Sequence, residues 1–423
     1  MIKLTTDRLV IRDHIGPDIL DLHSLLSVPV AMRFIPDLFS TSLSDSEENL
    51  RVAMEEAASG NRSKYFFAIT KEDKYIGEIG FTILENTHAF SVAELGYFIK
   101  PEFWGKGYVT EAARAVLDFA FDVVGVTKII TGCNAKNIAS ERIMNKLGMI
   151  KTDHLQAHSL LEGEWCDRVC YELIGKIDRH VRNRQKYQNE TGKSSAHVYQ
   201  FFTNKDSIFL KIDHTGSELN REVAIINWLT GKLPIPEVIE AFSMGDRTYL
   251  LMKAVQGQMV KSVIKAHSPE SIVKALANGV NRLHSIDVTD CPFENTLDMK
   301  LTSARKLLEN NQISTEDWEE NTLFESPEAL LEYLENNRPE EELVFTHGDY
   351  TKENIFIEGP EVTGFIDLGR AGIADQWQDL ALCIRTLRKL YKSEALIALF
   401  LKIIEIPMDE RKLDYYIMLD ELF

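Results

Sequence analysis

The sequence predicts an α+β fold in which a mixed α/β domain precedes a larger domain made of two lobes. The chain has 423 residues, which is too long for one ordinary core. Strands and helices intermingle in its first part, whereas from about residue 194 a few strands are followed by long helical patterns. Between these parts the composition turns abruptly basic. We therefore expect domains at residues 1–175 and 191–423, joined by a basic linker helix at 176–190.

The composition narrows the class of protein. Hydrophobic residues make up 44% and charged residues 26% of the chain, as in soluble globular proteins. No segment approaches the roughly 20 apolar residues that span a bilayer, and early charges exclude a signal peptide. Five scattered cysteines favour a reducing compartment. We expect a cytoplasmic protein without a membrane partner, and the sequence does not indicate its oligomeric state.

The charge balance bears on the partners. The formal net charge of −18 disfavours a broad nucleic-acid footprint and favours small cationic ligands. Acidity that only aids solubility is the alternative, and the charge does not separate the two. The basic run at 176–190 can mark nucleic-acid contact, but a solvated linker is the better interpretation. We therefore expect small-molecule partners and no nucleic acid.

The first domain opens with strand-like patterns. Alternation at Arg8–Arg12 predicts a first strand, and Tyr65–Ile69 with Tyr75–Ile83 predicts a meander. A further strand at Glu94–Ile99 runs into a glycine-containing turn. After this turn, apolar residues recur at helical spacing. These are Val109, Ala112, Val116, Phe119, Ala120 and Val123. The pattern predicts a strand that feeds a helix through a glycine loop.

The turn itself carries the first candidate site. Gly105 and Gly107 lie where the strand ends and the helix begins, and their missing side chains let backbone N–H groups approach a phosphate. Two such glycines alone also fit an ordinary tight turn. Further along, Asn137-x-x-Ser140 opens a second helix that ends in Lys146-Leu147-Gly148-Met149. This second motif strengthens the ligand-binding interpretation.

With these motifs, residues from about 4 to 173 resemble the GNAT superfamily of acetyl-CoA-dependent N-acetyltransferases, most closely its ribosomal-protein-alanine-acetyltransferase-like branch. The resemblance implies that the amides of residues 103–108 hold the CoA pyrophosphate and that the pantetheine arm follows Gly96–Ile99. The implied acetyl-CoA-binding residues are Trp104, Gly105, Lys106, Gly107, Tyr108, Asn137 and Ser140. Two departures stand out: Glu102 replaces the usual Gln or Arg, and the usual general-acid tyrosine is missing. The proton donor to the leaving thiolate is therefore unassigned.

The acceptor amine is open at this stage. Glu94 begins the strand beside the implied thioester site, which makes it a candidate catalytic base, although a surface carboxylate fits equally well. The domain could acetylate a small-molecule amine, acetylate a protein N-terminus, or act as an inactive CoA-binding or stabilising module.

The second domain carries the parts of a phosphoryl-transfer centre. Asp349 lies in Thr346-His347-Gly348-Asp349, Asn354 follows five positions later, and Asp367 ends the apolar run Gly364-Phe365-Ile366. One carboxylate can accept a hydroxyl proton, while an amide oxygen and the other carboxylate hold Mg²⁺. The alternative is that these are three buried polar residues whose spacing matches such a centre by accident.

An upstream strand adds a candidate phosphate-binding lysine. In Ser207–Ile212 the alternation places Phe209 and Lys211 on one face, so that Phe209 can stack on adenine while Lys211 pairs with phosphates. Glu222, on the next helix, can hold Lys211 in place. These residues predict an ATP site.

Residues from about 190 to 423 resemble the aminoglycoside 3'-phosphotransferase family. Matching stretches include Trp228–Pro236, Leu283–Asp287, Asp375-x-Trp377-x-Asp379 and Leu419–Phe423. The resemblance implies a bilobal protein-kinase-like fold, with a small lobe at about 191–255 and a large lobe at about 256–423. It makes Asp349 the catalytic base and Asn354 and Asp367 the Mg²⁺ ligands. The phosphate-covering and lobe-linking segments would add Ser194, Ser195, Lys253 and Val255 to the ATP site.

The same resemblance implies an acceptor site for a polycation. Such a site should be lined with carboxylates. The candidate substrate-binding residues are Glu316, Glu319, Glu320, Arg370, Glu421 and Phe423. An acidic helix surface and a frayed terminus are the alternatives. The sequence thus predicts a fused enzyme that uses ATP, Mg²⁺ and acetyl-CoA and confers resistance to aminoglycosides.

Overall fold

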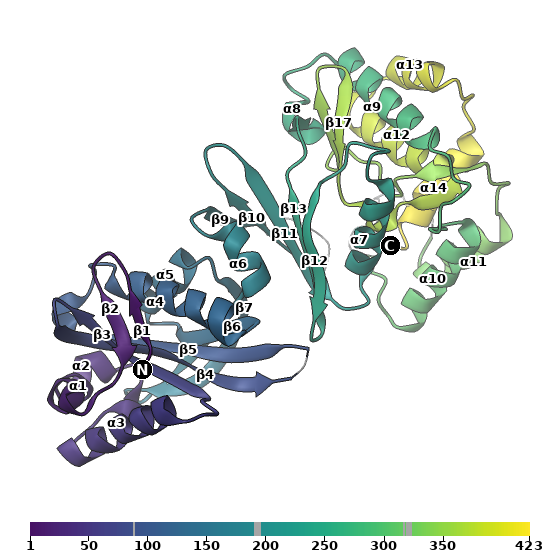
Figure 1. The fold of residues 1–423 in the computed structure, drawn as a ribbon. Coiled ribbons are helices and arrows are strands. Elements are labelled where there is room, and N and C mark those ends of the chain that lie inside the picture. The colour runs from purple at the N-terminus through teal and green to yellow at the C-terminus, as the bar shows by residue number, and fades with distance from the viewer. Residues whose placement is uncertain (88, 190–195, 316–317, 319–323) are drawn as a thin grey trace. The chain divides into compact units, whose positions relative to one another are not determined.

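The computed structural model describes residues 1–87, 89–189, 196–315, 318 and 324–423. The chain forms two compact units, the first made of Met1–Tyr187 with Phe201–Thr203 and the second of Gln188–Gln200 with Asn204–Phe423. Figure 1 follows the chain through both. The units divide after Tyr187, later than the boundary that the sequence predicts near residue 175. No helix in the described part of the chain is long and apolar enough to cross a bilayer.

The first unit is built on an eight-stranded sheet with the order β1-β2-β3-β4-β5-β6-β8-β7. All neighbouring strands run antiparallel except β5 and β6, which are parallel. The strands are β1 Lys3–Thr5, β2 Val10–Asp13, β3 Lys64–Lys71, β4 Lys74–Asn86, β5 Ser91–Ile99, β6 Lys128–Asn134, β7 Ile150–Leu161 and β8 Glu164–Ile174. The predicted meander and the strand before the glycine loop are confirmed by β3, β4 and β5.

Helices cover both faces of this sheet. In strand β3, Phe67 and Ile69 belong to the core cluster that includes helix α4, whereas Ala68 belongs to the cluster that includes α1. Because successive residues of a strand point to opposite faces, the two clusters lie on opposite sides of the sheet. The helices of this unit are α1 Ile19–Leu26, α2 Pro29–Met32, α3 Leu43–Ala58, α4 Tyr108–Asp118, α5 Ile138–Lys146 and α6 Gly175–Val181.

The basic segment differs from the predicted linker helix at 176–190. Helix α6 ends at Val181, and Gln185–Asn189 form strand β9. Ile177, Asp178 and Val181 are buried, and the Arg182 guanidinium lies 2.5 Å from Asp118 and also pairs with Asp178. Helix α6 is therefore packed on the first unit, because Ile177 and Val181 are buried there and Arg182 pairs with two carboxylates.

The small lobe of the second unit is a sheet with one helix. The five strands have the order β12-β13-β11-β10-β9, and helix α7 follows β11 in the chain. In β11, Ile208, Leu210 and Ile212 are buried, which confirms the predicted alternation. The remaining elements are β10 His197–Phe202, β11 Ser207–His214, α7 Glu218–Leu229, β12 Val238–Met244 and β13 Arg247–Lys253.

The large lobe is mostly helical, as the sequence predicts. Its long helices share one extended hydrophobic cluster with residues of α7 and β13. Two small sheets, β14-β16-β17 and β15-β18, carry the segments that contain the predicted catalytic residues. The helices are α8 Val260–Val263, α9 Pro269–His284, α10 Leu297–Glu309, α11 Pro327–Asn336, α12 Trp377–Tyr391, α13 Glu394–Ile404 and α14 Glu410–Asp420, and the strands are β14 Gln258–Met259, β15 Leu343–Thr346, β16 Ile355–Glu358, β17 Glu361–Phe365 and β18 Gly372–Asp375.

Candidate active sites

The loop that follows strand β15 is fixed by a buried carboxylate. The N–H groups of His347 and Gly348 donate to the two oxygens of Asp379 at 2.8 and 2.9 Å. Asp379 is fully buried on helix α12, and its Oδ2 also lies 3.3 Å from Nε2 of His284. On the other side, the Nε2 atom of His347 lies 3.0 Å from the carbonyl oxygen of Ile366. Asp349 therefore stands at the end of a rigidly held turn.

Gly348 allows this turn to form. Its φ angle is +82°, in the left-handed region that favours glycine. A Cβ atom at this position would lie 2.2 Å from the carbonyl oxygen of Arg370. The loop at 347–349 and the segment at 368–370 therefore approach each other closely because one residue has no side chain.

Asp349 and Asn354 are in direct contact. The Asn354 side-chain amide donates to the carbonyl oxygen of Asp349 at 3.1 Å and to its carboxylate at 2.8 Å. Burial raises the pKa of Asp349, and the charge of Asp420 raises it further. A raised pKa brings the carboxylate closer to the range in which it can accept a proton near neutral pH.

Lys211, Glu222 and Asp367 form an ion cluster. The Lys211 ammonium lies 2.9 Å from both carboxylate oxygens of Glu222 and 3.0 Å from Oδ1 of Asp367. Burial by itself lowers the pKa of Lys211, but the two carboxylates outweigh it and raise the pKa above its usual value. The same lysine lowers the pKa of Asp367, whereas burial raises that of Glu222. The cluster joins strand β11, helix α7 and the start of η5 (Leu368–Arg370).

The oxygens of Asp367 and Asn354 suit a hard cation. The side chain of Asp367 is 52% exposed, and because the Asn354 nitrogen is the atom that donates to Asp349, its amide oxygen is left to accept. One carboxylate and one amide oxygen fit Mg²⁺, which usually takes one or two protein ligands and completes its shell with phosphates and water. No group of three or more His, Cys, Asp and Glu residues able to hold a metal occurs among the described residues. A cation here would therefore need the phosphates of a nucleotide.

The structure places three of the other predicted ATP-binding residues. Phe209 shares strand β11 with Lys211 and is partly buried against the core. Val255 packs against Gly364, where an added Cβ would lie 2.6 Å from its Cγ2 atom. The N–H of Lys253 donates to the carbonyl oxygen of Glu237 at 2.9 Å. This amide is therefore not available to adenine, contrary to our expectation. Ser194 and Ser195 lie outside the described residues.

The C-terminal segment lies near Arg370. The Arg370 guanidinium is 6.0 Å from the centre of the Phe423 ring, and its Nε atom is 3.5 Å from Glu218. The indole N–H of Trp318 donates to the carbonyl oxygen of Glu421 at 2.9 Å. The predicted Glu316, Glu319 and Glu320 lie outside the described residues.

Lys300 is a buried cation near Phe423 that no sequence motif indicated. Its side chain is 8% exposed on helix α10, and its ammonium lies 5.7 Å from the centre of the Phe423 ring. Burial lowers the pKa of Lys300 to about 8, against the opposing charge of Asp420. A lone Lys in a helical pattern normally indicates a solvated face, so only the folded structure reveals this cation.

In the first unit, the glycine loop forms an open cradle. Gly105 and Gly107 have φ angles of +73° and +80°, and a Cβ atom on Gly105 would meet nothing within 4 Å. The amides of residues 105–108 donate to no group in the described part of the chain. The indole of Trp104 donates to the carbonyl oxygen of Ile99 at 2.9 Å, and Lys106 donates to that of Glu102 at 2.7 Å. These free amides at the start of α4 suit an anionic phosphate.

Asn137 and Ser140 are brought together at the start of helix α5. The side-chain oxygen of Asn137 accepts from the N–H of Ser140 at 3.1 Å, so Asn137 caps the helix. The Ser140 hydroxyl lies 2.9 Å from the hydroxyl of Tyr97. Glu94 lies apart from this pair, 46% exposed and 3.4 Å from Arg168. The structure leaves its role as a base a hypothesis.

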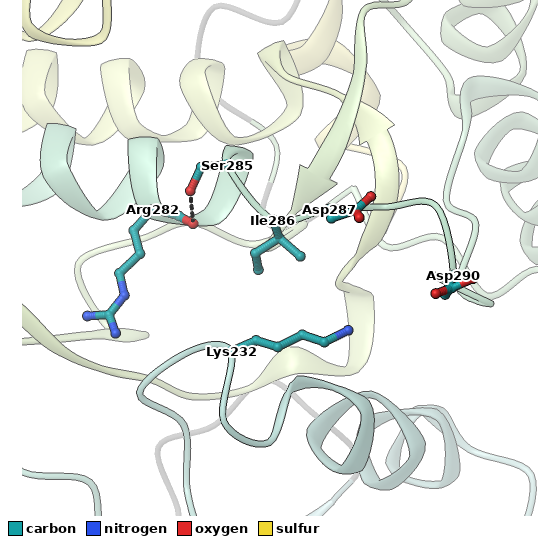
Figure 2. A pocket seen from close by; sticks show the side chains of 6 residues that line it. All are labelled: Lys232, Arg282, Ser285, Ile286, Asp287 and Asp290. Atoms are coloured by element: carbon teal, nitrogen blue, oxygen red, sulfur yellow. Dashed lines mark hydrogen bonds between the residues drawn. The ribbon is translucent and has the colours of Figure 1, made fainter.

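A separate pocket of about 470 Å³ opens in the second unit (Figure 2). It is lined by Lys232, Arg282, Ser285, Ile286, Asp287 and Asp290, none of which the sequence predicts as a site residue. The Lys232 ammonium lies 3.3 Å above the centre of the Trp228 ring. None of the predicted catalytic residues is among those that line this pocket.

Comparison with known proteins identifies the family of each domain. Residues 8–150 match the model of the acetyltransferase (GNAT) domain, and residues 189–401 match that of the phosphotransferase enzyme family. An aminoglycoside 3'-phosphotransferase of Enterococcus faecalis is 39% identical over 264 residues, which cover 60% of this chain and 98% of that protein. One from Acinetobacter baumannii is 31% identical over 264 residues, covering 59% and 99%. The crystal structure of a type VIII aminoglycoside 3'-phosphotransferase is 29% identical, with a TM-score of 0.52, and covers 58% of this chain and 96% of its own.

Proposed function

Because this chain belongs to the phosphotransferase enzyme family and carries a GNAT domain before it, we propose that it phosphorylates the 3'-hydroxyl of kanamycin-type aminoglycosides and so confers resistance. The named relatives are aminoglycoside 3'-phosphotransferases and match over nearly their whole length. The observation that carries the proposal is the contact of Asp349 with Asn354 beside the cluster of Lys211, Glu222 and Asp367.

Each of these residues has a role in the proposed reaction. Asp349 accepts the proton of the sugar hydroxyl, and burial helps because it raises the pKa of this carboxylate. Lys211, held by Glu222, binds ATP phosphates, and Phe209 and Val255 line the adenine end. Asn354 and Asp367 would hold Mg²⁺, which neutralises charge on the phosphates when it is bound.

The proposed acceptor is a polycation. The acidic residues Glu316, Glu319, Glu320 and Glu421 would bind its ammonium groups, and Phe423 would line the same site. The formal net charge of −18 supports a cationic ligand. Arg370 would lie on the phosphate side of this site, close to Asp349, because the close approach at Gly348 brings the two segments together.

Mass spectrometry of kanamycin incubated with the enzyme and ATP tests this function. A product heavier by about 80 Da, one added phosphoryl group, is expected. Asp349→Ala should lower the turnover by roughly 10²–10⁴-fold because it removes the base. Glu353→Gln is the matched control, since Glu353 lies in the same loop but pairs with Lys352 at 3.0 Å. Unchanged turnover of the Asp349 variant would refute the role of that residue.

For the first unit we propose acetyl transfer from acetyl-CoA to an amine. The open amides at Gly105 and Gly107, in a domain that matches the GNAT model, support binding of the CoA pyrophosphate. The acceptor is either an amine of an aminoglycoside or a protein N-terminus, and an inactive stabilising module is the remaining alternative.

Acetyl-CoA consumption separates these alternatives. The assay is run with kanamycin and, separately, with a peptide that has a free N-terminal alanine. A kanamycin product heavier by about 42 Da, one acetyl group, would identify a bifunctional resistance enzyme. An acetylated peptide would identify an N-terminal acetyltransferase. Consumption in neither assay, with no acetyl-CoA binding by calorimetry, would identify an inactive module.

A further inference from the structure

The two parallel strands of the first unit separate partway along their length. Strand β5 pairs with β6 only from Val92 to Glu94, opposite Lys128 to Ile130. One residue further along, a side-chain hydrogen bond joins the two strands, in which the Thr131 hydroxyl donates to the carbonyl oxygen of Leu95 at 2.9 Å. Beyond it, a Cβ atom on Gly96 would meet nothing within 4 Å. In the described part of the chain, β5 therefore has no strand partner on the side of β6 from Gly96 onwards, and the carbonyl oxygen of Ile99 accepts from the indole of Trp104 instead.

Tyr97 lies at this opening. Its hydroxyl lies 2.9 Å from Oγ of Ser140 and 3.3 Å from the carbonyl oxygen of the same residue. Ser140 is itself fixed, because its N–H donates to the side chain of Asn137. The phenol therefore reaches from β5 to the start of α5, beside the route that the free amides at 105–108 and the open edge of β5 mark for an acyl-CoA.

The state of this phenol suits a proton donor. Burial raises the pKa of Tyr97 to about 12, so the hydroxyl carries its proton at physiological pH. The other nearby tyrosine is engaged, since the Tyr171 hydroxyl donates to Oε1 of Glu141 at 2.8 Å. Tyr97 instead contacts the hydroxyl of Ser140, which can both donate and accept a hydrogen bond and so can pass a proton on.

Acyl transfer from a thioester requires such a donor. The amine nitrogen forms a bond to the acyl carbon, the C–S bond breaks, and its electron pair goes to sulfur. Resting on the proposed acetyltransferase function, we propose that the Tyr97 hydroxyl, positioned by Ser140, gives its proton to the departing CoA sulfur. The phenolate then regains, through Ser140 and water, the proton that the amine releases, so the step is balanced.

The proposal predicts a property of bound CoA that needs no acceptor. A hydrogen bond from Tyr97 to the sulfur stabilises the thiolate, so CoA should release protons when it binds to the full-length enzyme above pH 8. Calorimetry in two buffers of different ionisation enthalpy measures this release. Desulpho-CoA, which lacks the sulfur, should bind without it. We expect Tyr97→Phe to bind CoA but to raise the pKa of the bound thiol by about 1–2 units, the worth of one hydrogen bond to a charged group.

Two further variants sharpen the test. Ser140→Ala should give a smaller shift in the same direction, because it loosens the phenol without removing it. Tyr171→Phe, which removes a phenol from the same helix contact region, should release as many protons as the wild type. Equal proton release by wild type and Tyr97→Phe would overturn the role of Tyr97 while leaving the acetyltransferase function standing. No CoA binding by the wild type would overturn both.

Discussion

Lys211 and Glu222 form a buried bidentate ion pair, with the lysine ammonium 2.9 Å from each carboxylate oxygen. Their side chains are 12% and 5% exposed. The pair links strand β11 to helix α7, and the same glutamate accepts the N–H of Leu368 at 3.4 Å, next to Asp367. One carboxylate thus positions both the lysine proposed for the phosphates and the segment proposed for Mg²⁺.

Glu222→Gln should therefore impair ATP use more than folding. The amide keeps the side-chain volume but loses the charge that holds Lys211, so the KM for ATP should rise and kcat should fall. The free energy of unfolding should drop by about 1.5–3 kcal/mol, the usual contribution of a hydrogen bond to a charged group. ATP titration and chemical denaturation measure the two effects.

Glu394→Gln is the control for this prediction. Its carboxylate is 71% exposed and pairs with Arg388 at 3.2 Å. Exposed pairs contribute roughly 0–1 kcal/mol, so both the stability and the KM for ATP should stay near the wild-type values. A Glu222→Gln enzyme with a wild-type KM would contradict the positioning role.

Gly348→Ala should disrupt the catalytic loop. The left-handed φ alone costs a non-glycine residue about 1–2 kcal/mol, and the added methyl group would also collide with the Arg370 carbonyl at 2.2 Å. We expect loss of kanamycin phosphorylation together with a lower melting temperature. Gly359→Ala has a similar φ of +62° but open space around its Cβ, so it should show the backbone cost alone and remain active. Equal behaviour of the two variants would refute the close-approach argument.

The sequence motifs located Asp349, Asn354, Asp367, Lys211 and Glu222, and the fold brings all five together. Local spacing sufficed because each stands at the end or on one face of a strand or helix. The sequence indicated Asp379 only as part of a stretch that matches the family. Its bonds to the N–H groups of His347 and Gly348 could not be predicted, because it lies on a helix that starts about thirty residues after that loop. No local pattern marks Tyr97, because its partner Ser140 is 43 positions away in the sequence. Contacts of this kind depend on strand register and helix packing, which periodicity does not encode.

The acid limb of the kinase pH profile should report Asp349. Burial raises the pKa of this carboxyl, and the charge of Asp420 raises it further. The base must be ionised, so kcat/KM for kanamycin should fall on acidification at a higher pH than an ordinary aspartate would allow. Asp420→Asn removes the neighbouring negative charge and so lowers the pKa of Asp349, and the acid limb of the profile should move to lower pH. Asp414→Asn, an exposed carboxylate on the same helix, should leave it in place. A limb that moves upward in Asp420→Asn would contradict the assignment.

His14 should make the first unit less stable at alkaline pH. Its buried ring lies between two carboxylates, with Nε2 3.1 Å from Glu78 and Nδ1 3.5 Å from Asp18. Burial alone lowers the pKa of His14, but the carboxylates outweigh it and raise the pKa to about 9. The folded state therefore binds this proton more tightly than the unfolded chain, and the resulting stability is fully present below about pH 6.5 and lost as the pH rises through about 9. The shift from 6.5 to about 9 corresponds to about 3 kcal/mol at 1.36 kcal/mol per unit.

Hydrogen exchange of peptides from β2 and α1 tests this dependence in the intact chain. At pH 6.5, His14→Gln should exchange up to about 10²-fold faster than the wild type, because it lacks the buried charge that the two carboxylates stabilise. At pH 10 the wild-type ring is also neutral, so the ratio should shrink towards one. His154→Gln, whose ring is 51% exposed and lies 2.9 Å from Asp167, should match the wild type at both pH values. A His14→Gln ratio that stays constant between pH 6.5 and 10 would mean that the ring acts through packing, because only a titrating charge makes the difference depend on pH.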